Sequence, residues 1–236
     1  MPNNPATLVF LHYFGGAARS WQWVTERLPD YRCVALDLPG FGGTPPLDKP
    51  SIEGMTDYVR QETERLGLTK FTLLGHSMGG KIALQVAADD QRVQQLVLVA
   101  PSPPTVERMP DDEKERMLRH PDRDEAEATV ANGTYRPLLA ERHALAVATQ
   151  LEADEATWRW WLRQGMNHSI ADRVEKINIP ITILASDDDP VIDPATIRQE
   201  VMRVLPSARL VSTQEVGHLL PLEDPEWVAN QVRRVC

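Results

Sequence analysis

The sequence predicts a doubly wound α/β fold, in which helices cover both faces of a mostly parallel sheet of about six strands. Two observations carry this prediction. Short apolar runs alternate along the chain with longer stretches that have helical spacing. Most of the short runs are apolar throughout, as expected for strands that are buried on both faces of a parallel sheet. The chain length of 236 residues is also common for a single α/β domain.

Six apolar runs are expected to form the strands, and the last of them is the weakest candidate. In chain order they cover residues 7–11, 33–38, 71–74, 96–100, 181–185 and 208–212. Helices are expected at residues 21–28, 52–66, 78–88, 195–204 and 225–235. The last two helices have a proline near their first turn, where the missing N–H of proline is tolerated. Strands and helices that alternate in this way imply right-handed crossovers.

One segment interrupts the alternation. About eighty residues separate the fourth and fifth predicted strands, which is far more than a crossover needs. Residues 105–130 are densely charged, and residues 137–166 are mostly helix formers. We therefore expect residues 104–173 to form a helical cap or lid inserted over the sheet. Residues 1–103 and 174–236 would then form the core of the fold.

Composition and charge argue against several classes of protein. The net charge of −9 disfavours nucleic-acid binding, which needs clustered lysine and arginine. The first residues lack the features of a signal peptide, and no apolar run is long enough to cross a membrane. The two cysteines, Cys33 and Cys236, show neither a disulfide framework nor metal-ligand spacing. We therefore expect a cytoplasmic protein without a metal site or a membrane partner.

The most informative segment lies between the third predicted strand and the helix that follows it. It reads Gly75-His76-Ser77-Met78-Gly79, the G-x-S-x-G pattern of a nucleophile elbow. The elbow turns sharply, so that a side chain at the position two before or two after the serine would hit the neighbouring backbone. The two glycines meet this requirement. Ser77 is therefore the predicted nucleophile, and it needs a base and an orienting acid to become reactive.

The candidate bases are the histidines at positions 12, 76, 120, 143, 168 and 218. His218 is favoured because it follows the last predicted strand, where a loop can bring it back over the sheet. His76 adjoins the nucleophile, so its side chain should point away from the site. Of the others, His12 ends the first strand and the remaining three lie in the insertion.

The orienting acid is expected on the loop after the fifth predicted strand. This loop contains Asp187, Asp188 and Asp189, which cannot all face one histidine. Asp189 is favoured because a small residue precedes it by three positions, an apolar residue follows it by two, and Pro190 biases it toward an extended backbone. Asp188 remains the alternative. A placement after the fourth strand is disfavoured, because no carboxylate occurs there before Glu107.

The chain order Ser77, Asp189, His218 is the order found in α/β-hydrolases. Together with four short stretches, this order makes the chain resemble α/β-hydrolase-fold enzymes of the esterase and lipase type. The stretches are residues 12–16, 37–42, 75–80, and 189–190 with 216–218. The resemblance implies a serine hydrolase that cleaves a small, largely apolar carboxylic ester or related acyl compound through an acyl-enzyme. It implies no metal or organic cofactor.

The resemblance also implies an oxyanion hole made by two backbone N–H groups, those of Phe14 and Met78. Tyr13 stands where family members often have glycine, and it is a candidate substrate-binding residue. Trp158 and Trp161 lie three positions apart in the insertion, and remain candidates for both core packing and the lining of an acyl pocket. Family members usually carry two further strands before the first oxyanion loop. We therefore expect a six-stranded sheet that lacks this leading hairpin.

Several alternatives remain open at this stage. The same fold and triad occur in lyases, perhydrolases and carbon–carbon bond hydrolases, and also in receptors that bind a small ligand and turn it over slowly. The glycines at positions 40, 42 and 43 do not match a dinucleotide-binding pattern, so this stretch is expected to be a turn. Lys81 is expected to be a helix-surface residue.

Overall fold

The computed structural model describes residues 5–236 and contains a six-stranded sheet in which every neighbouring pair of strands is parallel. The strand order across the sheet is β2-β1-β3-β4-β5-β6. The strands are β1 (Thr7–Leu11), β2 (Arg32–Leu36), β3 (Phe71–His76), β4 (Val93–Val99), β5 (Ile181–Ser186) and β6 (Arg209–Thr213). The predicted fold class, a parallel α/β sheet of six strands, is confirmed.

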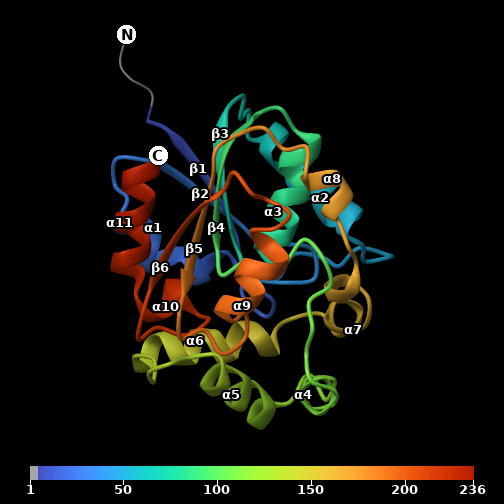
Figure 1. Cartoon of the computed structure of the whole chain (residues 1–236). Coiled ribbons are helices and arrows are strands. Elements are labelled where there is room, and N and C mark those ends of the chain that lie inside the picture. The colour runs from blue at the N-terminus through green and yellow to red at the C-terminus, as the bar shows by residue number, and fades with distance from the viewer. Residues whose placement is uncertain (1–4) are drawn as a thin grey trace.

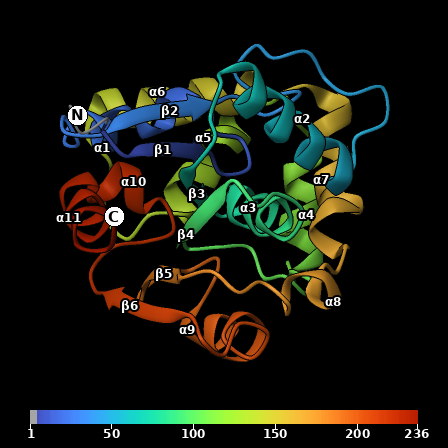
Figure 2. The ribbon, with the colours of Figure 1, turned by 90° about the horizontal axis from the view of Figure 1, so that it is seen from above.

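Helices pack on both faces of this sheet. The core helices are α1 (Gln22–Thr25), α2 (Ile52–Arg65), α3 (Met78–Asp89), α9 (Pro194–Thr196), α10 (Leu220–Glu223) and α11 (Pro225–Val235). The segment between β4 and β5 adds α4 (Asp111–Met117), α5 (Arg123–Asn132), α6 (Ala140–Leu151), α7 (Glu155–Arg163) and α8 (Ala171–Val174). Figure 2 shows α2, α3 and α8 on one side of the sheet, and α1 and α11 on the other.

Alternate residues of each strand supply two separate cores. In β1, Val9 and Leu11 face the cluster that includes α2 and α3, whereas Leu8 and Phe10 face the cluster that includes α1 and α11. Successive side chains of a strand point to opposite faces, so a strand covered on both sides must be apolar throughout. This explains why the uninterrupted apolar runs of the sequence mark the strands.

Three predicted elements differ from the observed ones in kind or by more than two residues at one end. Strand β4 begins at Val93, because the backbone of its polar residues still pairs with β3. The predicted helix 21–28 is a short 3₁₀ turn (Ala18–Trp21) followed by the four residues of α1. The predicted helix 195–204 is divided between α9 and a π-helical turn (Ile197–Val201).

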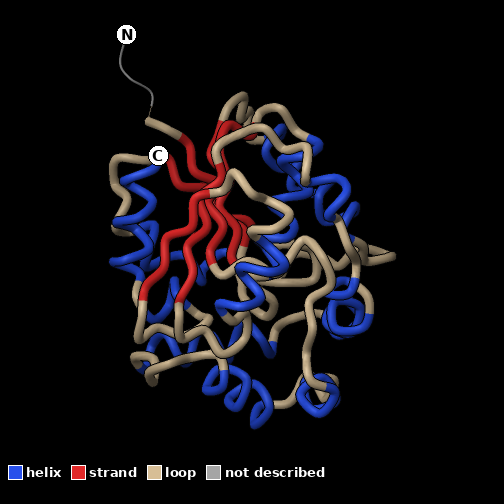
Figure 3. The backbone as a smooth tube through the Cα atoms, viewed as in Figure 1, coloured by secondary structure: helices blue, strands red, loops and turns tan. Residues whose placement is uncertain are grey.

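The long segment between β4 and β5 is helical, as expected. Figure 1 shows α4 to α7 beyond the carboxyl ends of the strands, and Figure 3 shows that no strand joins the sheet from this part of the chain. A short 3₁₀ turn, Gly165–Asn167, follows α7. Within residues 5–236, no helix is long and apolar enough to cross a membrane.

The central strand β3 provides a test of the packing. Leu73 is 0% exposed within the core, whereas Leu210 on the edge strand β6 is 37% exposed. Replacing Leu73 by alanine removes buried methyl groups and leaves a cavity, so Leu73→Ala should lower the free energy of unfolding by about 2–5 kcal/mol. Leu210→Ala is the matched control, with an expected change within about 0.5 kcal/mol. Urea unfolding measures both, and equal effects would contradict this account of the core.

Candidate active site

The turn at Ser77 joins the end of β3 to the start of α3. Ser77 has a φ of 52° and a ψ of −118°, a backbone conformation that is strained for a residue with a side chain. The turn is possible because two neighbours are glycine. A Cβ on Gly75 would lie 2.3 Å from the carbonyl oxygen of Gly79, and a Cβ on Gly79 would lie 2.5 Å from that of His12. The residues predicted to permit the elbow therefore occupy the positions where only glycine fits.

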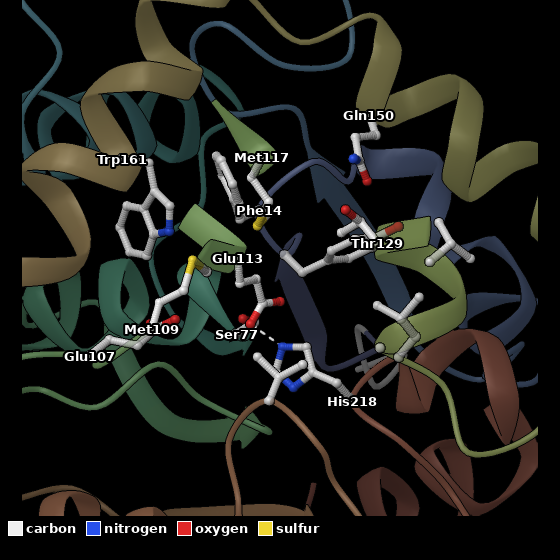
Figure 4. Close-up of a pocket in the computed structure, with 15 residues that line it drawn as sticks. Phe14, Ser77, Glu107, Met109, Glu113, Met117, Thr129, Gln150, Trp161 and His218 are labelled. Atoms are coloured by element: carbon white, nitrogen blue, oxygen red, sulfur yellow. Dashed lines mark hydrogen bonds between the residues drawn. The ribbon is translucent and has the colours of Figure 1, made fainter. Parts of the chain in front are cut away.

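His218 lies between Ser77 and Asp189. Its Nε2 is 2.8 Å from Oγ of Ser77, and its Nδ1 is 2.9 Å from Oδ2 of Asp189. Figure 4 shows the contact between His218 and Ser77 at the wall of a pocket. His218 is 6% exposed and Asp189 is 4% exposed. The structure thus brings together the three predicted side chains, which the sequence separates widely.

The neighbouring acid Asp188 has a different position. Its Oδ2 accepts a hydrogen bond from the backbone N–H of Glu215, and the pair is exposed. Asp189, by contrast, uses its Oδ1 to accept from the backbone N–H groups of Val191 and Ile192, at 2.8 and 2.9 Å. These bonds fix the carboxylate and leave Oδ2 for His218. Of the two alternatives that the sequence left open, the geometry therefore favours Asp189.

The charge around His218 tunes its proton affinity. Burial alone would lower the pKa of His218, but attraction to the Asp189 carboxylate and the hydrogen bond to it outweigh burial and raise the pKa above its usual 6.5. The carboxyl groups of Glu107 and Glu223 act in the same direction. With Nδ1 protonated toward Asp189, the neutral ring leaves Nε2 free to accept the Ser77 proton.

Several hydrogen bonds, some buried and some exposed, hold the loop that carries His218. The ring Nε2–H of His76 donates to the carbonyl of His218 at 2.8 Å, and burial lowers the pKa of His76 well below its ordinary value. The His218 N–H donates to the carbonyl of Gly133, and the Gly217 N–H donates to Glu223. The same Glu223 carboxylate accepts from the backbone N–H groups of residues 135 and 136. The loop is therefore attached to the segment between α5 and α6.

His76 was predicted to point away from the site. Its ring does not bond to Ser77, yet it supports the His218 backbone from behind, a contribution that the sequence did not reveal. The other histidines make contacts elsewhere: His120 with Ala153, His143 with Glu127 and His168 with Glu53.

The loop after β1 lies next to Ser77 and is fixed by His12. Nδ1 of His12 donates to the carbonyl of Tyr13 at 2.7 Å, and Nε2 accepts from the Leu38 N–H at 3.1 Å. Burial lowers the pKa of His12 to about 4, which keeps the ring neutral as these two bonds require. Within residues 5–236, neither the Phe14 nor the Met78 N–H takes part in the backbone bonds of the turns and loops. Both are thus available to an oxygen atom.

A pocket opens in front of Ser77 and His218. Figure 4 shows its lining residues, which include Phe14, Trp161 and two methionines. Tyr13 and Trp161, two of the predicted substrate-binding residues, belong to this lining. The third, Trp158, does not. Its ring lies behind Phe14 at a centroid distance of 4.1 Å and stacks on His120 at 4.2 Å, so it supports the wall without reaching the cavity.

Comparison with known proteins agrees with this geometry. A profile of the alpha/beta hydrolase family matches residues 8–231. The chain belongs to the alpha/beta hydrolase family. The predicted family resemblance is therefore confirmed, and with it the expectation of a hydrolase-family enzyme.

The proteins to which this chain is similar are named for different activities. The chain is 30% identical to a Bacillus subtilis (strain 168) protein named as a 2-succinyl-6-hydroxy-2,4-cyclohexadiene-1-carboxylate synthase, over 95% of this chain and 88% of the relative. Among solved structures, an esterase from Exiguobacterium antarcticum has a TM-score of 0.88 at 18% identity, covering 98% of this chain and 91% of that one. A bromoperoxidase from Bacillus anthracis has a TM-score of 0.87 at 17% identity, with the same coverage. These structural likenesses show a shared fold.

Glu107 is a pocket residue that sequence reasoning set aside. It lies on the loop after β4, is buried, and accepts a hydrogen bond from the Ser102 hydroxyl. Burial raises the pKa of the Glu107 carboxyl, although Ser102 and Lys81 oppose the rise. The Ser102 N–H in turn donates to the carbonyl of Ser77. Glu107 was set aside as the acid of the triad because it lies several residues after the end of the fourth strand. That spacing gives no information about whether the side chain lines the pocket.

The prediction that Lys81 lies on the helix surface is wrong. Lys81 is 0% exposed, and its Nζ donates to the carbonyls of Thr105 and Met166 at 2.8 and 3.3 Å. The segment between β4 and β5 covers this turn of α3, which a reading of helical spacing alone could not foresee. Burial lowers the pKa of Lys81 to about 8, against attraction by Glu107.

Lys81 should make the stability of this hydrolase depend on pH. Its pKa falls from 10.5 to about 8 on folding, so between these values the unfolded chain binds more protons than the folded one. The free energy of unfolding of the wild type should therefore rise with pH relative to that of Lys81→Met, by up to about 3 kcal/mol. Urea unfolding at pH 7 and pH 10 measures this difference. The exposed Lys176→Met is the control, and a flat difference for Lys81→Met would contradict the prediction.

Proposed function

We propose that this protein is a serine hydrolase that cleaves a small, largely apolar carboxylic ester or related acyl compound. The observation that carries the proposal is the chain of contacts from Ser77 through His218 to Asp189, at 2.8 and 2.9 Å. A hydroxyl, an imidazole and a carboxylate in this relation form the catalytic triad of acyl-transfer enzymes. The pocket with aromatic and methionine walls that opens on Ser77 supports an apolar acyl group.

In the proposed mechanism, Oγ of Ser77 attacks the ester carbonyl while Nε2 of His218 takes the hydroxyl proton. Asp189 holds the imidazole in the correct tautomer and stabilises its charged form. His218 then gives the proton to the leaving alcohol, and an acyl-enzyme remains on Ser77. Water, activated by His218, attacks this acyl group and releases the acid by the same steps in the second half-reaction.

The anion that forms at the carbonyl needs donors in fixed positions. The N–H groups of Phe14 and Met78 are proposed to supply them, and Met78 begins α3, where the helix dipole favours negative charge. Loss of one such donor typically costs about 3 kcal/mol of transition-state stabilisation. His12 contributes indirectly, because it fixes the loop that carries Phe14. In the same proposal, residues 104–173 act as a cap that shapes the pocket over the core formed by residues 1–103 and 174–236.

A second candidate is a lyase, a class that shares this fold and triad, since a relative named as a synthase and not as a hydrolase is 30% identical over 95% of this chain. Such a reaction would use Ser77 and His218 without a simple ester as substrate. A panel of p-nitrophenyl esters with acyl chains of increasing length separates the two. Repeated turnover with an optimum chain length supports the hydrolase, whereas the absence of turnover favours the lyase or a ligand receptor.

Replacing the nucleophile is the direct test of the triad. Ser77→Ala should lower kcat on the best p-nitrophenyl ester by at least ~10⁴-fold, because the acyl-enzyme can no longer form. The fold should persist, as judged by an unchanged circular dichroism spectrum and cooperative melting. Ser212→Ala, an exposed serine on β6, is the control and should retain wild-type turnover. Turnover of Ser77→Ala within tenfold of wild type would refute the role of Ser77.

The pH profile tests the role of His218. The base must be neutral to accept a proton, and its pKa is raised above 6.5. The value of kcat/KM should therefore fall as the pH drops through the raised pKa, with a midpoint above 6.5. Stopped assays of the hydrolysis of a neutral ester, in buffers that cover a range of pH, measure this fall in kcat/KM. A midpoint below 6.5 would show that Asp189 does not govern the protonation of His218 in the working enzyme.

A further inference from the structure

The pocket in front of Ser77 is lined by acidic side chains and by no basic one other than His218, among residues 5–236. Two of its side chains, Glu107 and Glu113, are carboxyl groups, and both reach the pocket wall (Figure 4). Within the described residues 5–236, no lysine or arginine lines this pocket. The remaining polar side chains of the wall are uncharged, except that His218 gains and loses a proton in the proposed reaction.

The nearest cations are bound to other groups. Nη1 of Arg116 lies 3.0 Å from the Glu125 carboxylate and donates to the hydroxyl of Thr129 at 3.2 Å. Its Nη2 is 3.8 Å from a carboxylate oxygen of Glu113, and among residues 5–236 this buried nitrogen has no hydrogen-bond partner. Lys81 is fully buried and donates to two backbone carbonyls. Neither of these two cations is among the residues that line the pocket in front of Ser77.

A neutral polar side chain also faces the pocket. Gln150 is 6% exposed, and its side-chain amide is directed into the pocket in Figure 4. No hydrogen bond joins this amide to another pocket residue in the figure. A buried amide normally finds a partner, so a polar group of the substrate is the natural candidate. An amide can donate to, or accept from, an uncharged ester, hydroxyl or amine.

These features act together on a charged substrate. A carboxylate that enters a pocket loses its hydration, and this loss is offset only if a cation or several donors replace the water. Here it would instead meet the carboxylate of Glu113 and the carboxyl of Glu107. A cation would meet those carboxyl groups and a wall that includes the aromatic side chains of Phe14 and Trp161, whose π-systems also attract positive charge.

We propose that the pocket selects acyl compounds that are uncharged or positively charged and rejects those whose acyl chain ends in a carboxylate. This inference rests on the proposed esterase function, because it assigns the acyl group of the substrate to the pocket in front of Ser77. It defines the substrate class more narrowly than the apolar wall alone does. In this proposal, Glu113 is the lining residue that carries the discrimination.

Three p-nitrophenyl esters of similar length test the proposal. They are the methyl adipate ester, which is neutral, the adipate half-ester, which ends in a carboxylate, and the 6-aminohexanoate ester, which ends in an ammonium group. After subtraction of spontaneous hydrolysis, the wild type should show a kcat/KM for the half-ester at least about tenfold below that for the neutral ester. The ammonium ester should be turned over at least as well as the neutral one.

Two variants that each remove one negative charge test whether Glu113 causes the discrimination between the neutral ester and the half-ester. Glu113→Gln should narrow the gap between the neutral ester and the half-ester at least about threefold, since it removes the carboxylate from the wall. Glu115→Gln lies on the exposed side of the same helix and should leave the gap unchanged. This pair separates the effect of the pocket from that of the overall charge of −9, which the two variants alter equally.

Each outcome has a distinct meaning. Turnover of the half-ester within threefold of the neutral ester by the wild type would overturn the inference, as would equal effects of the two variants. These results leave the proposed hydrolase intact if the neutral ester is still cleaved and Ser77→Ala abolishes that cleavage. Failure of the wild type to cleave any of the three esters, or cleavage that survives Ser77→Ala, would instead count against the proposed function.

Discussion

The site depends on the close approach of the Ser77 turn to the carboxyl end of β1. Gly79 packs against the carbonyl oxygens of residues 11 and 12, and Gly75 packs against the backbone of Gly79. This contact places the first turn of α3 beside the end of β1, where the loop that carries Phe14 begins. The strained backbone of Ser77 is maintained by the packing of two strands and a helix around it. The remaining groups need only be brought to this fixed point.

Buried polar contacts bring them there. Asp189 is held by two backbone N–H groups, and the His218 loop is supported by His76 and Glu223. Because Asp189, His218 and His76 are almost fully removed from water, an unsatisfied partner of any of them would be costly, and their arrangement is therefore narrowly defined. The same burial moves the pKa of His12 and His76 down, while the carboxylate of Asp189 moves that of His218 up. The pKa values of these three histidines are thus shifted in different directions, by burial in two cases and by a neighbouring carboxylate in the third.

Much of this could be predicted from the sequence, and the reasons are local. The strands were visible because burial on both faces demands apolar runs, and the elbow was visible because Gly75 and Gly79 leave a fixed spacing around Ser77. Asp189 and His218 could be placed because loops after parallel strands meet at one edge of the sheet. The buried state of Lys81 and the pocket position of Glu107 could not be predicted, because both depend on how the segment between β4 and β5 folds over α3. Helical propensity locates the helices of that segment but not the surface on which they pack.

Glu223 has a consequence for how this fold can be rebuilt. Its one carboxylate accepts from the N–H groups of Gly217, Tyr135 and Arg136, and so connects the last loop of the core to the turn between α5 and α6. A Cβ on Gly217 would lie 2.5 Å from the Tyr135 nitrogen, so a residue larger than glycine does not fit at this contact. A chimaera that exchanges the helical segment for that of a homologue must therefore transplant this turn together with residues 217–223 as a matched pair. Grafts cut on either side of this contact would separate His218 from the groups that hold its loop.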